Sequence, residues 1–211
     1  MFVAALALAA ALAASQPNLA KLILKPSVVG KGYDIGILPT GLGGADRTLD
    51  LCGVKNYPSE SLRTARIQVG YTKTNGKLEL SNELVRYKSG GAAEAMKEVA
   101  QHAATCPSKP IAFEGQPPLV YTISRIADPK LLPGSLALRV DVSGTIKGKK
   151  VHAVRFTVYQ RIGNTLSGVY SYVTAPGVTV AAQQAFVLHA AEASAKLLRS
   201  RLQPQPGSPP A

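Results

Sequence analysis

The chain has 211 residues, of which 24 are Lys or Arg and 12 are Asp or Glu, so its formal net charge is +12 at pH 7. This length predicts one domain with a buried core of its own. The basic charges are scattered, and the sequence has neither an arginine-rich arm nor a nucleic-acid-binding motif, which excludes a nucleic-acid-binding module.

The N-terminus is apolar: residues 1–14 read MFVAALALAAALAA and are followed by Ser-Gln-Pro. An apolar run of this length before small residues is typical of the core and cleavage region of a secretory signal. It is too short to span a bilayer, which takes about 20 residues. The usual N-terminal positive charge is missing, since the first basic residue is Lys21. We expect a signal-like segment over 1–15, a secreted protein, and no stable membrane span in the mature chain.

Residues 16–50 are rich in glycine and weakly periodic, which is typical of a loop. The leucines and valines at 22–24 and 28–29 suit a short strand or an extended arm. We predict that 16–50 forms a flexible N-terminal arm in front of a domain over 51–202. Residues 203–211 are proline-rich and predict a disordered tail.

Two strands open the domain. Apolar and polar residues alternate over 64–72, which predicts a half-buried strand with Arg66 on its polar face. An Asn-Gly pair follows, a hairpin signal because both residues tolerate positive φ. The return strand is 77–87, and its apolar parity changes partway along, which predicts a bulge near Ser81 and Asn82.

A helix, four strands and a second helix complete the domain. Apolar residues recur at helical spacing over 92–105, and Pro107 ends this helix. Four strand-like runs separated by short gaps indicate antiparallel hairpins. They cover residues 119–126, 136–146, 151–161 and 166–174. With a long last helix over 178–202, the order predicts an α+β fold: an antiparallel sheet of about six strands with two helices packed on one face.

The stretch from Cys52 to Pro107 contains the run SNELVRYKSGGAAEAM and ends in Cys-Pro. In these motifs and in the order of its elements, the chain resembles the extracellular sensor-domain family of actinobacteria. That family includes the outer domain of a mycobacterial receptor Ser/Thr kinase and free-standing secreted or lipoprotein relatives. The resemblance implies an α+β domain with a cleft and a ligand-binding or sensing role, without catalytic residues to carry over. The chain departs from the kinase member in lacking cysteines for a second disulfide.

Cys52 and Cys106 are the only cysteines. Export would place them where a disulfide can form and persist, so we predict a bond that ties the loop before the hairpin to the end of the first helix. Two free buried thiols or a redox pair are the alternatives, although the sequence has no CxxC motif.

Aromatic and basic side chains in the strands are the candidate ligand-binding residues. Tyr170 and Tyr172 lie on one face of the last strand, and helices packed on the opposite face would leave them lining a groove. Ordinary cross-strand packing is the alternative. Arg66 is one of five strand arginines that suit a bidentate bond to an anionic ligand. A solvated face paired with Asp141 and Glu79 explains these arginines equally well. The other four are Arg86, Arg125, Arg139 and Arg155.

Catalytic and metal-binding motifs are absent from the sequence. It contains no GxSxG, HExxH or phosphate-binding loop motif. The three histidines, His102, His152 and His189, are not at metal-ligand spacing. We therefore predict no catalytic residues, no metal and no cofactor. A dispersed active site assembled from distant residues is the alternative.

Together these features predict a secreted, non-enzymatic ligand-binding or sensor-like domain of the cell envelope. Its partner would be an unknown small ligand, an anionic wall polymer or an envelope protein. A secreted hydrolase with a dispersed active site and a basic, cell-wall-associated interaction protein are the other two hypotheses. An apolar groove favours small-molecule binding, a polar cleft with perturbed titrating groups favours an enzyme, and a flat basic face favours the polymer.

Overall fold

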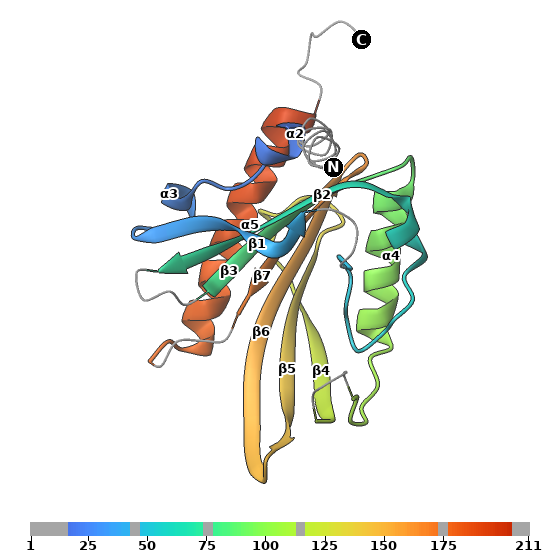
Figure 1. Ribbon diagram of the computed structural model, residues 1–211, viewed down its shortest axis with the longest axis vertical. Helices are drawn as coiled ribbons and strands as arrows, with labels where there is room; N and C mark the ends of the chain where they lie inside the picture. The colour runs from blue at the N-terminus through green and yellow to red at the C-terminus, as the bar shows by residue number, and fades with distance from the viewer. Residues whose placement is uncertain (1–16, 43–46, 74–77, 113–116, 173–176, 204–211) are drawn as a thin grey trace, which may run out of the picture.

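One antiparallel sheet of seven strands runs through the protein, in the order β1-β2-β3-β7-β6-β5-β4 (Figure 1). The computed structural model describes residues 17–42, 47–73, 78–112, 117–172 and 177–203. The strands are β1 (Tyr33–Leu42), β2 (Arg63–Lys73), β3 (Leu78–Tyr87), β4 (Leu119–Ile126), β5 (Leu136–Ile146), β6 (Lys149–Ile162) and β7 (Thr165–Ser171). A single bridge between Ile111 and Leu119 extends the β4 edge. The predicted signal-like segment and the tail after residue 203 lie outside the described residues.

The two long helices, α4 (Gly91–Ala104) and α5 (Val180–Leu202), lie on opposite faces of this sheet (Figure 1). In β6, Phe156 and Val158 belong to the core under α5, whereas Tyr159 belongs to the core under α4. The α+β class is confirmed, but the prediction of about six strands with both helices on one face is wrong. Alternation had suggested one buried face per strand, yet the central strands bury side chains on both.

Residues 17–42, within the stretch expected to be a flexible arm, take part in the fold. Leu19 and Leu22 are at most 2 % exposed and pack into the core under α5. Gly41 allows the close approach of β1 to β2, since a Cβ there would overlap the backbone carbonyl oxygen of Gln68. The short helices outside the sheet are α2 (Pro17–Ala20), α3 (Pro26–Val29) and the 3-10 helix η1 (Pro58–Leu62).

The first hairpin and both long helices were predicted within two residues of their observed bounds. β2 and β3 pair antiparallel, while the Asn-Gly turn between them lies outside the described residues. Ser81 and Asn82 pair in register with β2, whereas the register shifts at Glu79, so the irregularity lies two residues before the predicted bulge; both faces of β3 are buried. Thr179 caps α5 by accepting a hydrogen bond from the backbone N–H of Ala182 at 3.1 Å. Across the described ranges, no helix combines the length and the apolar character that crossing a membrane requires.

Candidate functional site

A cleft of about 380 Å³ opens on the face of the sheet that carries α4. Side chains from β2 to β7 form its floor, because residues of one parity in each strand point to the same face. The pairing register places them side by side: Glu83 lies between Gln68 and Gly168, and Gly168 lies next to Tyr159. The loop 47–52 forms the wall of the cleft.

A buried ion pair lies at the β2–β3 end of the floor. Arg66 is 4 % exposed and Glu83 is 1 % exposed, and Arg66 Nε donates a hydrogen bond to Glu83 Oε1. Tyr170 OH donates to Glu83 Oε2 at 2.8 Å, and Arg66 Nη2 donates to Gln68 Oε1 at 2.9 Å. Burial raises the pKa of Glu83, whereas the charge and hydrogen bond of Arg66 and the hydrogen bond of Tyr170 act to lower it. These bonds fix the side chains at this end of the cleft.

The position of Tyr170 depends on a glycine two residues earlier in β7. The phenol of Tyr170 lies over Gly168, where a Cβ would overlap its hydroxyl oxygen, and from there it reaches Glu83. Its ring also contacts Tyr159 edge to face, with the ring centroids 5.7 Å apart. Burial raises the pKa of Tyr170 well above its usual value, so the hydroxyl keeps its proton and donates to the carboxylate at neutral pH.

Side chains of the following segment hold the wall of the cleft. Glu60 in η1 accepts a hydrogen bond from the backbone N–H of Thr48 at 3.1 Å. Tyr57 OH accepts from the N–H of Leu51 at 2.9 Å and donates to the carbonyl of Leu51 at 3.1 Å. Burial raises the pKa of Tyr57 to about 12, so this hydroxyl stays protonated and keeps its donor bond at neutral pH. The wall is thus ordered by specific bonds although it is a loop.

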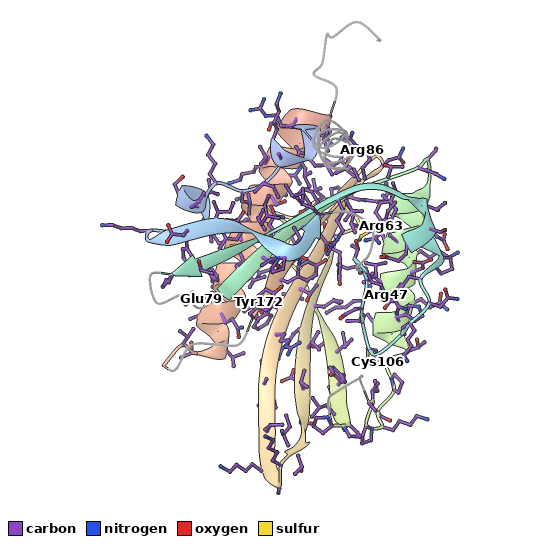
Figure 2. All side chains as sticks on the ribbon, viewed as in Figure 1. Arg47, Arg63, Glu79, Arg86, Cys106 and Tyr172 are labelled. Atoms are coloured by element: carbon purple, nitrogen blue, oxygen red, sulfur yellow. A yellow bond between two sulfur atoms is a disulfide. The ribbon has the colours of Figure 1, made fainter. Side chains whose placement is uncertain are left out.

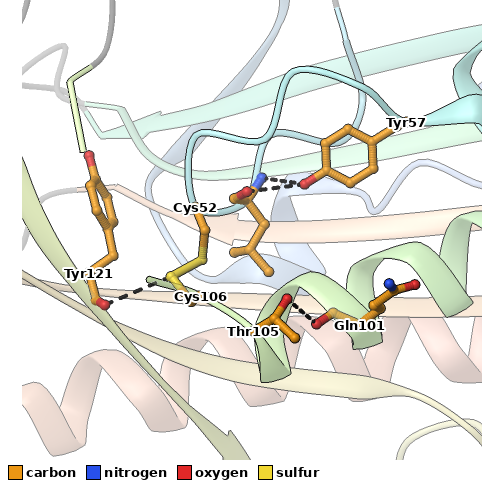
Figure 3. The surroundings of a disulfide bond; sticks show 7 residues. Cys52, Tyr57, Gln101, Thr105, Cys106 and Tyr121 are labelled. Carbon is orange, nitrogen blue, oxygen red and sulfur yellow. Dashed lines mark hydrogen bonds between the residues drawn. A yellow bond between two sulfur atoms is a disulfide. The ribbon is translucent and has the colours of Figure 1, made fainter. Parts of the chain in front are cut away.

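The predicted disulfide between Cys52 and Cys106 is confirmed, and it fastens the wall to the end of α4 (Figure 3). Cys52 has φ 56°, in the left-handed region that residues other than glycine rarely adopt. The crosslink and the adjacent bonds of Tyr57 hold this turn. Cys106 Sγ lies 3.8 Å from the carbonyl oxygen of Tyr121 in the floor, a contact and no hydrogen bond, since a disulfide sulfur carries no proton.

Two arginines and one aspartate that line the cleft are exposed to solvent. Arg47 in the wall and Arg155 in β6 are exposed, and neither has a carboxylate oxygen within 4 Å among the described residues. Figure 2 shows Arg47 on the side of the sheet that carries α4. Asp50 also lines the cleft and is open to solvent, yet the surrounding protein desolvates its carboxylate and raises its pKa, against the lowering effect of Arg155 and Arg47.

The three predicted ligand-binding residues, Arg66, Tyr170 and Tyr172, all line this cleft. Arg66 and Tyr170 are bound to Glu83 and shape the floor. Tyr172 is half-buried, and its hydroxyl lies 3.2 Å from the hydroxyl of Ser81. The structure therefore brings the three together, and their role in binding stays a prediction.

The other strand arginines divide between the two faces of the sheet. Arg139 makes a bidentate ion pair with Asp141, with both nitrogen–oxygen distances 2.8 Å. This agrees with the alternative hypothesis that strand arginines pair with acidic residues such as Asp141. Arg155 instead reaches the cleft. Sequence reasoning missed Arg47 and Asp50, because they lie in a loop without periodic pattern. Within the ranges that the structure describes, no group of three or more His, Cys, Asp and Glu side chains could hold a metal ion.

Comparison with known proteins gives a likeness in structure and no match in sequence. No protein-family model matches the chain, and no curated protein is detectably similar to it in sequence. The structure is similar to that of the extracellular domain of PknH from Mycobacterium tuberculosis, with 14 % sequence identity and a TM-score of 0.47. The match covers 84 % of this chain and 94 % of that domain. The likeness is a distant one.

Proposed function

We propose that the chain is an extracytoplasmic, non-enzymatic domain that binds or senses a small ligand in the cleft. The observation that supports this function is the cleft itself. Its volume of about 380 Å³ falls within the range of small-molecule sites, roughly 300 to 1,000 Å³. The disulfide and the bonds of Tyr57 and Glu60 hold its wall in place without a ligand. A preformed site loses less free energy to ordering when a ligand binds.

The disulfide also supports the proposed location. Disulfides persist in oxidising compartments and are rare in the reducing cytosol. The apolar run over 1–14, typical of a secretory signal, is a second and independent observation in favour of export.

The cleft is polar and holds groups with shifted pKa values, the pattern expected of an enzyme, but the groups in its floor are engaged in hydrogen bonds with one another, which supports binding. Glu83 already accepts one hydrogen bond at each carboxylate oxygen, from Arg66 and from Tyr170. Ser171 Oγ accepts a hydrogen bond from the backbone N–H of Phe156 at 2.7 Å. None of the described residues that line the cleft is a histidine, so the hydroxyls there have no imidazole to activate them.

A fragment screen followed by ¹H–¹⁵N NMR tests this function. We expect hits to shift the backbone signals of cleft residues such as Tyr121, Val140 and Thr157, which lie on three different strands. Shifts that gather elsewhere on the surface, or a library without hits, would contradict the proposal.

A matched pair of variants ties the signals to the cleft. Thr157→Trp places an indole in the floor, whereas Ser143→Trp adds the same group at an exposed position of β5 with the opposite parity. Binding of the hits should be lost in the first variant and kept in the second. Circular dichroism and thermal melting show whether each variant is folded, and Val142→Phe serves as a second block if Thr157→Trp is not.

A further inference from the structure

We propose that the cleft takes a small monoanion, such as a carboxylate with an adjoining ring or short apolar chain, and that Arg47 and Arg155 bind its charged group. This inference rests on the proposed function and adds the chemical class of the ligand.

The charges in the cleft are not balanced internally. Arg66 is neutralised by Glu83 in the floor. Arg47 and Arg155 remain, and both line the same cleft as Asp50, whose pKa their charges lower. With Asp50 ionised, these three groups have one positive charge in excess, which matches one negative charge on a ligand.

Among the described residues, Arg63, Arg66 and Arg139 have carboxylate partners, and the remaining arginines have none within 4 Å. Arg139, on the opposite face of β5, binds both oxygens of Asp141 at 2.8 Å. Arg63 lies 3.1 Å from Glu60. Arg47 and Arg155 have no carboxylate within 4 Å in the described ranges, although Asp50 lines the same cleft. Their guanidinium groups therefore keep the planar donor pairs that bind a carboxylate in bidentate fashion.

The surface beside Arg155 is apolar and aromatic. Val140 lies opposite Arg155 in the β5–β6 register, and Tyr121 lies opposite Val142 in the β4–β5 register. Val140, Val142 and Tyr121 all line the cleft. A ligand whose anionic group binds Arg155 would thus place the atoms next to that group against these side chains.

Three small probes with the same ring separate charge from shape: benzoate, benzyl alcohol and benzylamine. Each is titrated into the full chain while the backbone signals of Tyr121, Val140 and Thr157 are followed by NMR. We expect benzoate to bind at least about tenfold more tightly than the other two, because a hydrogen bond to a charged group is worth roughly one such factor or more. Arg47→Gln and Arg155→Gln should each weaken benzoate by about tenfold and leave benzyl alcohol unchanged.

Arg201→Gln is the matched control, since it removes the same charge from an exposed position at the end of α5. Equal binding of benzoate and benzyl alcohol, or benzoate binding that survives both cleft substitutions, would overturn the assignment of an anion and leave the proposed function standing. If none of the three probes shifts the cleft signals, the anion assignment also fails, while the fragment screen decides the proposed function separately.

Discussion

Removal of the Cys52–Cys106 crosslink should lower the free energy of unfolding by about 4 kcal/mol. The bond joins residues 54 positions apart in the sequence. In the chain-entropy model, closing a loop of that length restricts the unfolded chain by about 4 kcal/mol at 25 °C. For a chain of this size each kcal/mol corresponds to about 2–4 °C, so the melting temperature should fall by roughly 8–16 °C.

The experiment compares urea unfolding of the oxidised protein with that of the Cys52→Ser, Cys106→Ser double variant. Tyr57→Phe is the control: it removes the hydroxyl that bonds Leu51 and keeps the crosslink. We expect it to cost only about 1–3 kcal/mol, the penalty for leaving buried backbone groups unpaired. Amide exchange of Leu51 should speed up in both variants. A loss below about 1 kcal/mol in the double variant would refute the chain-entropy account of the crosslink.

Three further predictions concern the floor and the charge of the cleft. Gly168→Ala should displace Tyr170 from Glu83 and cost about 1–3 kcal/mol by overpacking, measured by urea unfolding; an unchanged midpoint would contradict it. Arg66→Met should cost about 3–5 kcal/mol at pH 7, because it leaves Glu83 buried without its partner. The pKa of Glu83 is raised by burial, so protonation on acidification should reduce this loss; a loss that grows as the pH falls would be inconsistent with it. Asp50→Asn removes the negative charge that opposes an anion in the cleft, so it should strengthen benzoate binding at pH 7, where the probe is ionised; unchanged or weaker binding would exclude Asp50 as the opposing charge.

Strand alternation predicted most of the elements but could not tell a solvated face from the floor of a cleft. In 64–72 the apolar parity was assigned to the core and Arg66 to the polar face. The structure keeps this alternation, yet Arg66 is 4 % exposed, because its face lies beneath the wall and next to Glu83. A polar parity in a sequence is compatible with either outcome, since the covering segment is far away in the chain.

The parity change in β3 is a second case in which the alternation within one strand does not show what covers its two faces. A bulge would have moved the apolar side chains to the other face. Instead Leu84 packs under α5 and Val85 packs under α4, so both parities are apolar in the part of β3 that pairs with β2 in continuous register, beyond the irregularity at Glu79. Such a pattern arises where a strand is central and covered on both sides. Predicting that β3 is covered on both faces requires the order of the strands in the sheet. The sequence does not supply that order, because its pattern predicts a loop where the edge strand β1 lies.

The two faces of the sheet have different roles: the face under α5 contributes to stability, and the face under α4 carries the proposed binding site. The face under α5 forms a closed core with the leucines of α2 and its neighbours. The face under α4 is shared between that helix and the cleft, and the disulfide joins the end of α4 to the wall. A substitution in the first core should therefore lower stability without a selective effect on ligands. Arg47, Asp50 and Arg155 make no bond on which the fold depends within the described ranges, so their exchange should change ligand preference with little loss of stability.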